Sequence, residues 1–158
     1  MANTRWLDET ELRAWIGYRR MRLLLDAEVG RDLMRSAGLS MSDYDVLSAL
    51  ADAQDQRQRL TALAARMLWS KSRLSRHISR MEARGLVVRE EDATDARRAD
   101  VVLTPKGLQA IVEAAPDHVE SVREHFVDLL TQEQLRLFGD FAEIVLDRLP
   151  PREGDGSG

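Results

Sequence analysis

Cysteine is absent from the 158 residues of this chain. Disulfides, thiolate zinc sites, cysteine nucleophiles and thiol-based oxidant sensing within the chain are therefore excluded. The longest apolar runs are only a few residues, far short of the ~20 needed to cross a bilayer, and residues 1–13 lack the apolar core of a signal peptide. The sequence therefore predicts a cytoplasmic protein with no membrane partner.

Catalytic and cofactor motifs are also missing. The chain has no glycine-rich phosphate loop, no nucleophile elbow and no HExxH pair. Its carboxylates are scattered along polar helix faces, so no acid–base pair stands out. His118 and His125 share a helix face near Asp117 and Glu124, which leaves a metal as an alternative, but zinc usually needs three or four converging ligands. We predict no enzyme activity, no cofactor and no metal site.

Charge is distributed unevenly along the chain. The formal net charge is −4, yet residues 59–107 hold eleven Lys/Arg against six Asp/Glu. The remaining residues hold twelve basic and twenty-one acidic side chains. One basic segment in an acidic protein favours a polyanion as its partner.

A long helix is expected near the N-terminus. Apolar residues recur every three or four positions between Trp6 and Met34, and Gly38 is expected to end the helix. At ~1.5 Å per residue, such a helix spans roughly 40 Å. One compact domain cannot cover that length, so we expect much of the apolar face to meet another chain.

Capping residues mark the start of the next helices. Ser42 with Asp45 resembles a capping box for a second helix, and Thr61 is expected to cap a short third helix after a polar loop. Ser70 is expected to cap the fourth helix, which would stop at Gly85. These elements predict a helix-turn-helix.

Two strands and a charged hairpin are expected next. Residues 86–89 and 99–103 are rich in β-branched side chains, and the eight to ten residues between them would form a wing loop. A further helix follows, in which Pro116 should cause a kink or an interruption. A capping box over residues 131–134 would start the last helix.

The helix from Lys71 to Arg84 carries the predicted DNA contacts. Leu74, Ile78 and Met81 form a narrow apolar stripe, and the opposite side has no carboxylate before Glu82. Hydroxyl groups and arginines donate to phosphates, and arginine pairs bidentately with guanine. The residues expected to face DNA are Ser70, Lys71, Ser72, Arg73, Ser75, Arg76 and Arg80. We expect Lys71 and Arg80 at the DNA backbone and His77 on the DNA or solvent side, the alternative being a solvated basic face without a ligand.

Acidic and basic residues alternate in the expected wing, residues 92–98. An arginine at its tip, Arg97 or Arg98, is suited to the narrow and strongly negative minor groove. Asp95 is expected to hold an arginine in place through a charged hydrogen bond. The alternative is a salt-bridged hairpin that binds nothing.

Six segments together resemble the MarR family of bacterial transcriptional regulators, in that family's order and spacing. The resemblance extends to about Leu149, and its most specific pair is the Asp-x-Arg wing element with the Leu-Thr-x-x-Gly exit. The segments are 39–47, 60–64, 72–78, 85–89, 95–98 and 103–107.

The resemblance implies a mainly α (α+β) fold: a winged helix-turn-helix with a two- to three-stranded wing sheet and long terminal helices that form a dimerisation region. The expected divisions are an N-terminal dimerisation helix (1–38), a DNA-binding domain (39–104), C-terminal dimerisation helices (105–149) and a disordered tail (150–158). A homodimer would place two winged modules on double-stranded DNA with half-sites roughly 34–36 Å apart. Arg97 would occupy the position of the wing-tip arginine.

Many members of this family release DNA when a small, often phenolic or anionic, molecule enters a pocket between the dimer helices and the winged module. The side chains on the corresponding elements are suited to an aromatic carboxylate, although core and dimer packing is the alternative. They are Trp15, Tyr18, Arg19, Arg22, Met41 and Tyr44.

The sequence therefore favours a ligand-responsive repressor that binds a near-palindromic operator as a homodimer. Two alternatives stay open. A winged module used for architecture or protein docking would bind random and cognate duplexes equally. An enzyme or small-molecule carrier would bind no DNA at physiological salt.

Overall fold

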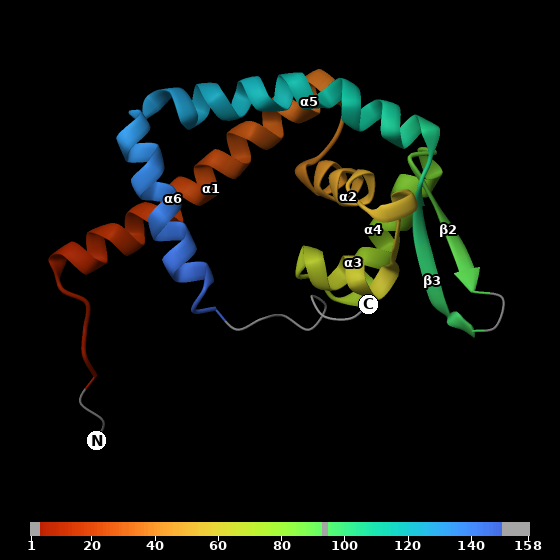
Figure 1. Cartoon of the computed structure of the whole chain (residues 1–158), viewed down its shortest axis with the longest axis horizontal. Helices are drawn as coiled ribbons and strands as arrows, with labels where there is room; N and C mark the ends of the chain where they lie inside the picture. The colour runs from red at the N-terminus through yellow and green to blue at the C-terminus, as the bar shows by residue number, and fades with distance from the viewer. Residues whose placement is uncertain (1–3, 93–94, 150–158) are drawn as a thin grey trace.

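The computed structural model describes residues 4–92 and 95–149, and Figure 1 shows their arrangement. Three described strands form one antiparallel sheet in the order β1 (Arg57–Arg59), β3 (Asp95–Leu103), β2 (Val87–Asp92). The predicted mainly α fold with a winged helix-turn-helix is therefore confirmed. In chain order the elements are α1 (Glu9–Ala37), α2 (Met41–Ala51), η1 (Gln54–Gln56), β1 (Arg57–Arg59), α3 (Leu60–Met67), α4 (Lys71–Ala83), β2 (Val87–Asp92), β3 (Asp95–Leu103), α5 (Pro105–His125), η2 (Val127–Leu129) and α6 (Gln132–Leu146).

Two long helices form one side of the molecule. In Figure 1, α5 lies along the second half of α1. Helices α2, α3 and α4 and the sheet lie together on one side of this pair. Gly38, with φ 65°, ends α1 as predicted. None of the described helices is long and apolar enough to span a membrane.

Two predicted caps are wrong. The capping box of α2 is formed by Ser40 and Asp43, because the chain is still extended at Ser40 and has already entered the helix at Ser42. Helix α3 begins at Leu60, directly after β1, and its N-cap residue makes no side-chain capping bond. Thr61 therefore lies inside the first turn and is not the cap.

The wing is longer and more regular than predicted. Strand β1 occupies part of the segment expected to be a polar loop, and β2 and β3 extend through most of the expected wing loop. Charged residues continue the ladder because they pair across it: Arg57 bonds to Glu90, and Arg59 Nε lies 3.3 Å from Asp100 Oδ1. Residues 93 and 94 and the expected tail, 150–158, lie outside the described residues.

Helix α5 runs through Pro116 without the expected interruption. The proline is exposed, whereas Ala114 before it and Ser121 after it are both buried. Packing of α5 against α1 and α2 on both sides of the proline holds the helix together despite the lost backbone donor.

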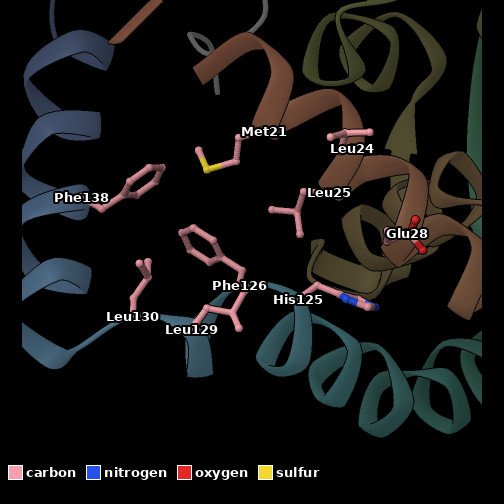
Figure 2. Close-up of a pocket in the computed structure, with 9 residues that line it drawn as sticks. All are labelled: Met21, Leu24, Leu25, Glu28, His125, Phe126, Leu129, Leu130 and Phe138. Atoms are coloured by element: carbon pink, nitrogen blue, oxygen red, sulfur yellow. The ribbon is translucent and has the colours of Figure 1, made fainter. Parts of the chain in front are cut away.

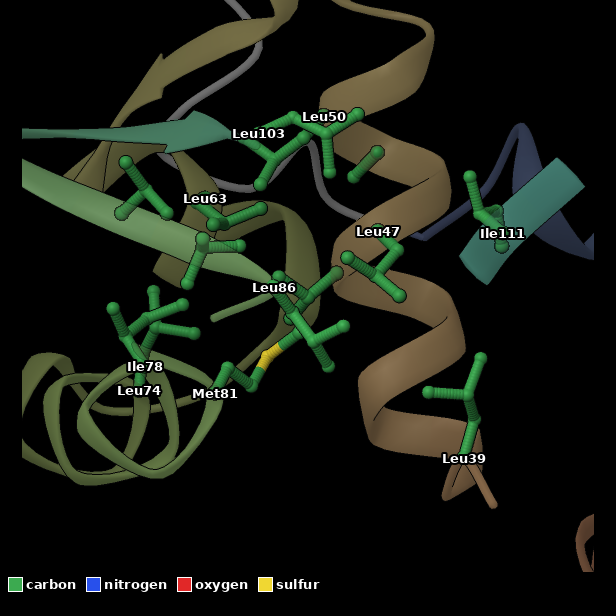
Figure 3. Packing of buried hydrophobic residues seen from close by; sticks show 14 of the residues in the cluster. Leu39, Leu47, Leu50, Leu63, Leu74, Ile78, Met81, Leu86, Leu103 and Ile111 are labelled. Carbon is green, nitrogen blue, oxygen red and sulfur yellow. The ribbon is translucent and has the colours of Figure 1, made fainter. Parts of the chain in front are cut away.

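The hydrophobic core joins α2, α3, α4 and the sheet (Figure 3). Leu47 and Leu63 are fully buried and meet the buried side of α4, formed by Leu74, Ile78 and Met81. Burial of each such side chain contributes about 1.5–3 kcal/mol. The core therefore holds α4 by one side and leaves its other side at the surface.

Candidate nucleic-acid interface

Helix α4 has an exposed basic side. Ser70 caps it as predicted, because its hydroxyl accepts the backbone N–H of Arg73 at 3.2 Å. Ser75 is only half-exposed, and its carbonyl accepts a hydrogen bond from Arg89. The structure brings the other predicted DNA-facing residues of α4 together at the surface: Lys71, Ser72, Arg73, Arg76 and Arg80.

The turn before α4 supports one of these arginines. Leu68 takes a left-handed conformation with φ 60°, which turns the chain between α3 and α4. The Cζ atom of Arg73 lies 4.0 Å from the centroid of the Trp69 ring. This cation–π contact holds the Arg73 guanidinium against the protein surface.

The expectation that His77 faces DNA or solvent is wrong. His77 is only 7% exposed. Its ring meets the Trp69 ring edge-on at 5.3 Å, and its Nδ1 lies 3.1 Å from Nη2 of Arg80. Its Nε2 lies 3.1 Å from Oδ1 of Asp43, close but without the alignment of a hydrogen bond. The buried stripe of α4 is therefore wider than its apolar residues indicate.

Asp43 is a buried carboxylate that connects two parts of the chain. Its Oδ2 accepts hydrogen bonds from the Ser40 backbone at 3.0 Å and from Arg84 Nη1 at 2.7 Å. Arg84 also donates from Nη2 to the carbonyl of Gly38 at 2.9 Å. Burial raises the pKa of Asp43, but contacts with His77, Arg84 and Ser40 outweigh burial and hold the pKa well below its usual range. Asp43 is therefore ionised and ties the end of α4 to the junction of α1 and α2.

Arg89 joins the wing to α4. It donates from its backbone to Glu82 Oε1 at 2.7 Å and from Nη2 to the Ser75 carbonyl at 3.0 Å. Sequence reasoning missed Arg89 and Asp43 as parts of this region and placed His77 on the wrong side of the helix. The only available signal was that Arg89 is an arginine in an expected strand immediately after the basic helix.

The predicted wing arginines lie in an irregular part of β3. Glu91 pairs with Ala99, whereas Asp92 pairs with Asp95, so the register shifts between the two pairs. The backbones of Arg97 and Arg98 fall within that shift, and such bulges redirect side chains. Arg98 is exposed. The side chains of Asp95 and Arg97 lie outside the described part of the structure, so their roles stay predictions.

The six predicted effector residues are not gathered into one cavity of this chain. Trp15, Tyr18 and Arg19 form a cluster on the exposed first half of α1, with the two rings 6.0 Å apart. The Tyr44 ring contacts the His118 ring in a tilted arrangement, with centroids 4.2 Å apart, and Met41 packs against the core.

One predicted effector residue, Arg22, does line a cavity. This open cavity of about 620 Å³ lies between α1, α2 and the α3–α4 turn. Its lining is mostly polar and includes Arg73 of α4: Arg22, Asp26, Ser42, Asp45, Ser48, Ala49, Arg66, Met67, Trp69 and Arg73. Burial raises the pKa of Asp45.

The two histidines of α5 make separate contacts. His125 Nε2 lies 2.8 Å from Asp32 Oδ2, whereas His118 faces Tyr44. Burial lowers the pKa of His118. Within the described ranges, no three potential metal ligands converge.

A helix-turn-helix with an exposed basic second helix, followed by an antiparallel wing, defines a winged-helix protein with a surface for DNA. A family model described as "MarR family" matches residues 37–98. The transcriptional regulator HosA of Escherichia coli is 35% identical over 121 residues, which cover 77% of this chain and 87% of HosA. The chain belongs to the MarR family, and it is a DNA-binding transcriptional regulator.

Two solved structures from Streptomyces coelicolor are similar over nearly the whole chain. AbsC, a MarR family regulator, is 40% identical with a TM-score of 0.83, and the match covers 91% of this chain and 97% of AbsC. Sco3205, solved in complex with DNA, is 35% identical with a TM-score of 0.87, and the match covers 98% and 97% of the two chains.

Proposed function

We propose that the protein is a ligand-responsive repressor that binds a near-palindromic operator as a homodimer, with no catalytic role. The observation that carries this proposal is the exposed side of α4, on which Lys71, Ser72, Arg73, Arg76 and Arg80 all reach the surface beside the wing. In the proposed complex α4 occupies the major groove, and Arg97 or Arg98 occupies the minor groove. Affinity comes mainly from counterions released from the phosphates.

The exposed apolar surface of the terminal helices supports the homodimer. None of the described residues of α6 is buried, although the helix carries large apolar side chains. Phe141, Ile144 and Val145 are each more than half exposed. In Figure 2, Met21, Phe126 and Phe138 point toward one another around an open apolar cavity of about 410 Å³ between α1, the end of α5 and α6. An apolar surface of this extent is typical of a protein interface. We propose that a second copy covers it, with 1–38 and 105–149 as the dimerisation regions.

The polar cavity supports the response to a ligand. Arg22, Arg66 and Arg73 can together bind a small anion such as an aromatic carboxylate. Because Arg73 also lies on α4, an occupant that binds Arg73 competes with DNA. With benzoate as the probe, we expect operator release from the wild-type protein and little release from Arg66→Ala. Equal release from both proteins, or none from either, contradicts this site.

Selection of genomic fragments by the purified full-length protein tests the proposed function. We expect enrichment of near-palindromes with half-site centres about 10 bp apart. Equal retention of random and selected duplexes contradicts operator specificity and supports an architectural module. Absence of any retardation at physiological salt contradicts a role on DNA.

A further inference from the structure

We propose that His77 is a positioning residue for DNA binding, whose buried ring holds the exposed arginines Arg80 and Arg73 in place on the DNA-facing side of α4. The inference rests on the proposed contact of these two arginines with DNA. Arg73, His77 and Arg80 follow at spacings of four and three, so they lie along one side of the helix.

The contact with Arg80 is direct. Nη2 of Arg80 lies 3.1 Å from Nδ1 of His77. A guanidinium only donates hydrogen bonds, so Nδ1 must act as the acceptor and carries no proton. The ring hydrogen is then on Nε2, which faces the Asp43 carboxylate. Although this contact is not aligned as a hydrogen bond, the negative charge of Asp43 favours a proton on Nε2 and therefore the tautomer that can accept the bond from Arg80.

The contact with Arg73 passes through Trp69. The His77 ring meets the indole edge-on, with an interplanar angle of 89°. The guanidinium of Arg73 lies over the same indole, 4.0 Å from its centroid. The imidazole therefore supports the ring on which Arg73 rests.

Asp43 anchors this arrangement to the body of the protein. It is 4% exposed and is held by the Ser40 backbone and by Arg84. His77 therefore has a fixed support on its Nε2 side and an exposed arginine on its Nδ1 side. An arginine that is already held loses less conformational freedom on binding, which corresponds to roughly 2- to 10-fold in affinity.

A double-mutant cycle on the full-length protein tests the inference. The variants are His77→Gln, Arg80→Ala and their combination, and the affinity for a selected operator duplex is measured by fluorescence anisotropy. Glutamine keeps an amide donor for Asp43 but lacks the acceptor at the Nδ1 position. We expect His77→Gln to weaken binding roughly 2- to 10-fold and to cause a smaller loss in the Arg80→Ala background, where only the support of Arg73 remains to be lost.

A second variant, His77→Asn, serves as the conservative rescue. Its amide oxygen lies near the Nδ1 position and can accept from Arg80, so we expect it to bind DNA more tightly than His77→Gln. A purely structural role for His77 predicts no such rescue. If His77→Gln fails to fold, the cycle of His77→Asn with Arg73→Ala tests the other contact, because asparagine lacks the ring edge that meets Trp69, and we again expect non-additive losses.

The outcomes separate the inference from the proposed function. If Arg80→Ala and Arg73→Ala leave affinity unchanged, the proposed DNA contacts are wrong. If the arginine variants weaken binding but the losses multiply in both cycles, those contacts stand and the positioning role of His77 is wrong.

Discussion

The hydroxyl of Ser121, in α5, donates a hydrogen bond of 2.8 Å to the carboxylate of Asp32, in α1. The same oxygen of Asp32 lies 2.8 Å from Nε2 of His125. These contacts, with Ser121 the largest contributor, lower the pKa of Asp32 below its ordinary 3.8. The two long helices are thus joined by one ionised carboxylate.

This contact predicts a specific pH dependence. A carboxyl group whose pKa is lowered by folding stabilises the protein above its ordinary pKa, and that stability is lost as the pH falls below 3.8 toward the folded pKa. We expect Asp32→Asn to unfold more easily than the wild type at neutral pH, and the difference to shrink in acid. Urea titrations at several pH values measure it. Asp128→Asn, at an exposed aspartate paired with Arg123, is the control; a constant difference for Asp32→Asn contradicts the prediction.

Replacing Arg97 with alanine tests the wing. We expect weaker binding to all duplexes and a salt slope that is shallower by about one unit per site, because one phosphate contact is lost. Arg76→Ala should instead change the preferred bases at one or two positions. Mobility-shift titrations over a range of salt concentrations distinguish the two, with the exposed Arg123→Ala on α5 as the control. If Arg97→Ala leaves both the affinity and the salt slope unchanged, the assignment of Arg97 as the wing contact is wrong.

Gly107, the glycine of the Leu-Thr-x-x-Gly segment, lies where the neighbouring atoms leave no room for a side chain. A Cβ atom at Gly107 would lie 2.0 Å from the Leu86 carbonyl oxygen and 2.8 Å from Leu103 Cδ1. We expect Gly107→Ala to lower the free energy of unfolding by about 3 kcal/mol through overpacking. Gly85→Ala has room but requires φ 74°, which costs roughly 1–2 kcal/mol. Chemical denaturation measures both, and the opposite order contradicts the steric explanation.

A charge on the exposed apolar side of α6 tests the proposed dimer. Phe141 is 61% exposed in one protomer. We expect Phe141→Glu to shift the protein from dimer to monomer in sedimentation velocity, because a buried unpaired carboxylate opposes association. Glu143→Gln on the same helix should leave the mass unchanged. If Phe141→Glu sediments like the wild type, the partner does not cover this part of α6.

Local patterns in the sequence were sufficient to predict the order of the helices and the basic side of α4. They were insufficient where distant residues decide the outcome. Ser40–Asp43 and Ser42–Asp45 have the same spacing, and only the path of the chain after Gly38 selects the first pair. The burial of His77 depends on Asp43 and on Trp69, which no local periodicity reports.

The effector residues show the same limit. Aromatic and arginine residues on α1 and α2 were expected to converge. Trp15 and Tyr18 lie on the exposed first half of α1, whereas Met41 of α2 lies beside Gly30 in the second half of α1. Arg66 and Arg73 line the polar cavity because the turn between α3 and α4 folds back toward α1. That approach depends on tertiary packing, which residue type alone does not specify.

Because α5 is one continuous helix, movement at one of its ends is transmitted to the other. At its start, Thr104 donates to the Gly85 carbonyl at 2.7 Å, and near its end His125 meets Asp32 of α1. Its 21 residues correspond to roughly 30 Å, so a ten-degree tilt at one end displaces the other by roughly 5 Å. That displacement exceeds the rise between neighbouring base pairs, so in the proposed homodimer a slight rotation between the two subunits is enough to move their α4 helices out of register with successive major grooves.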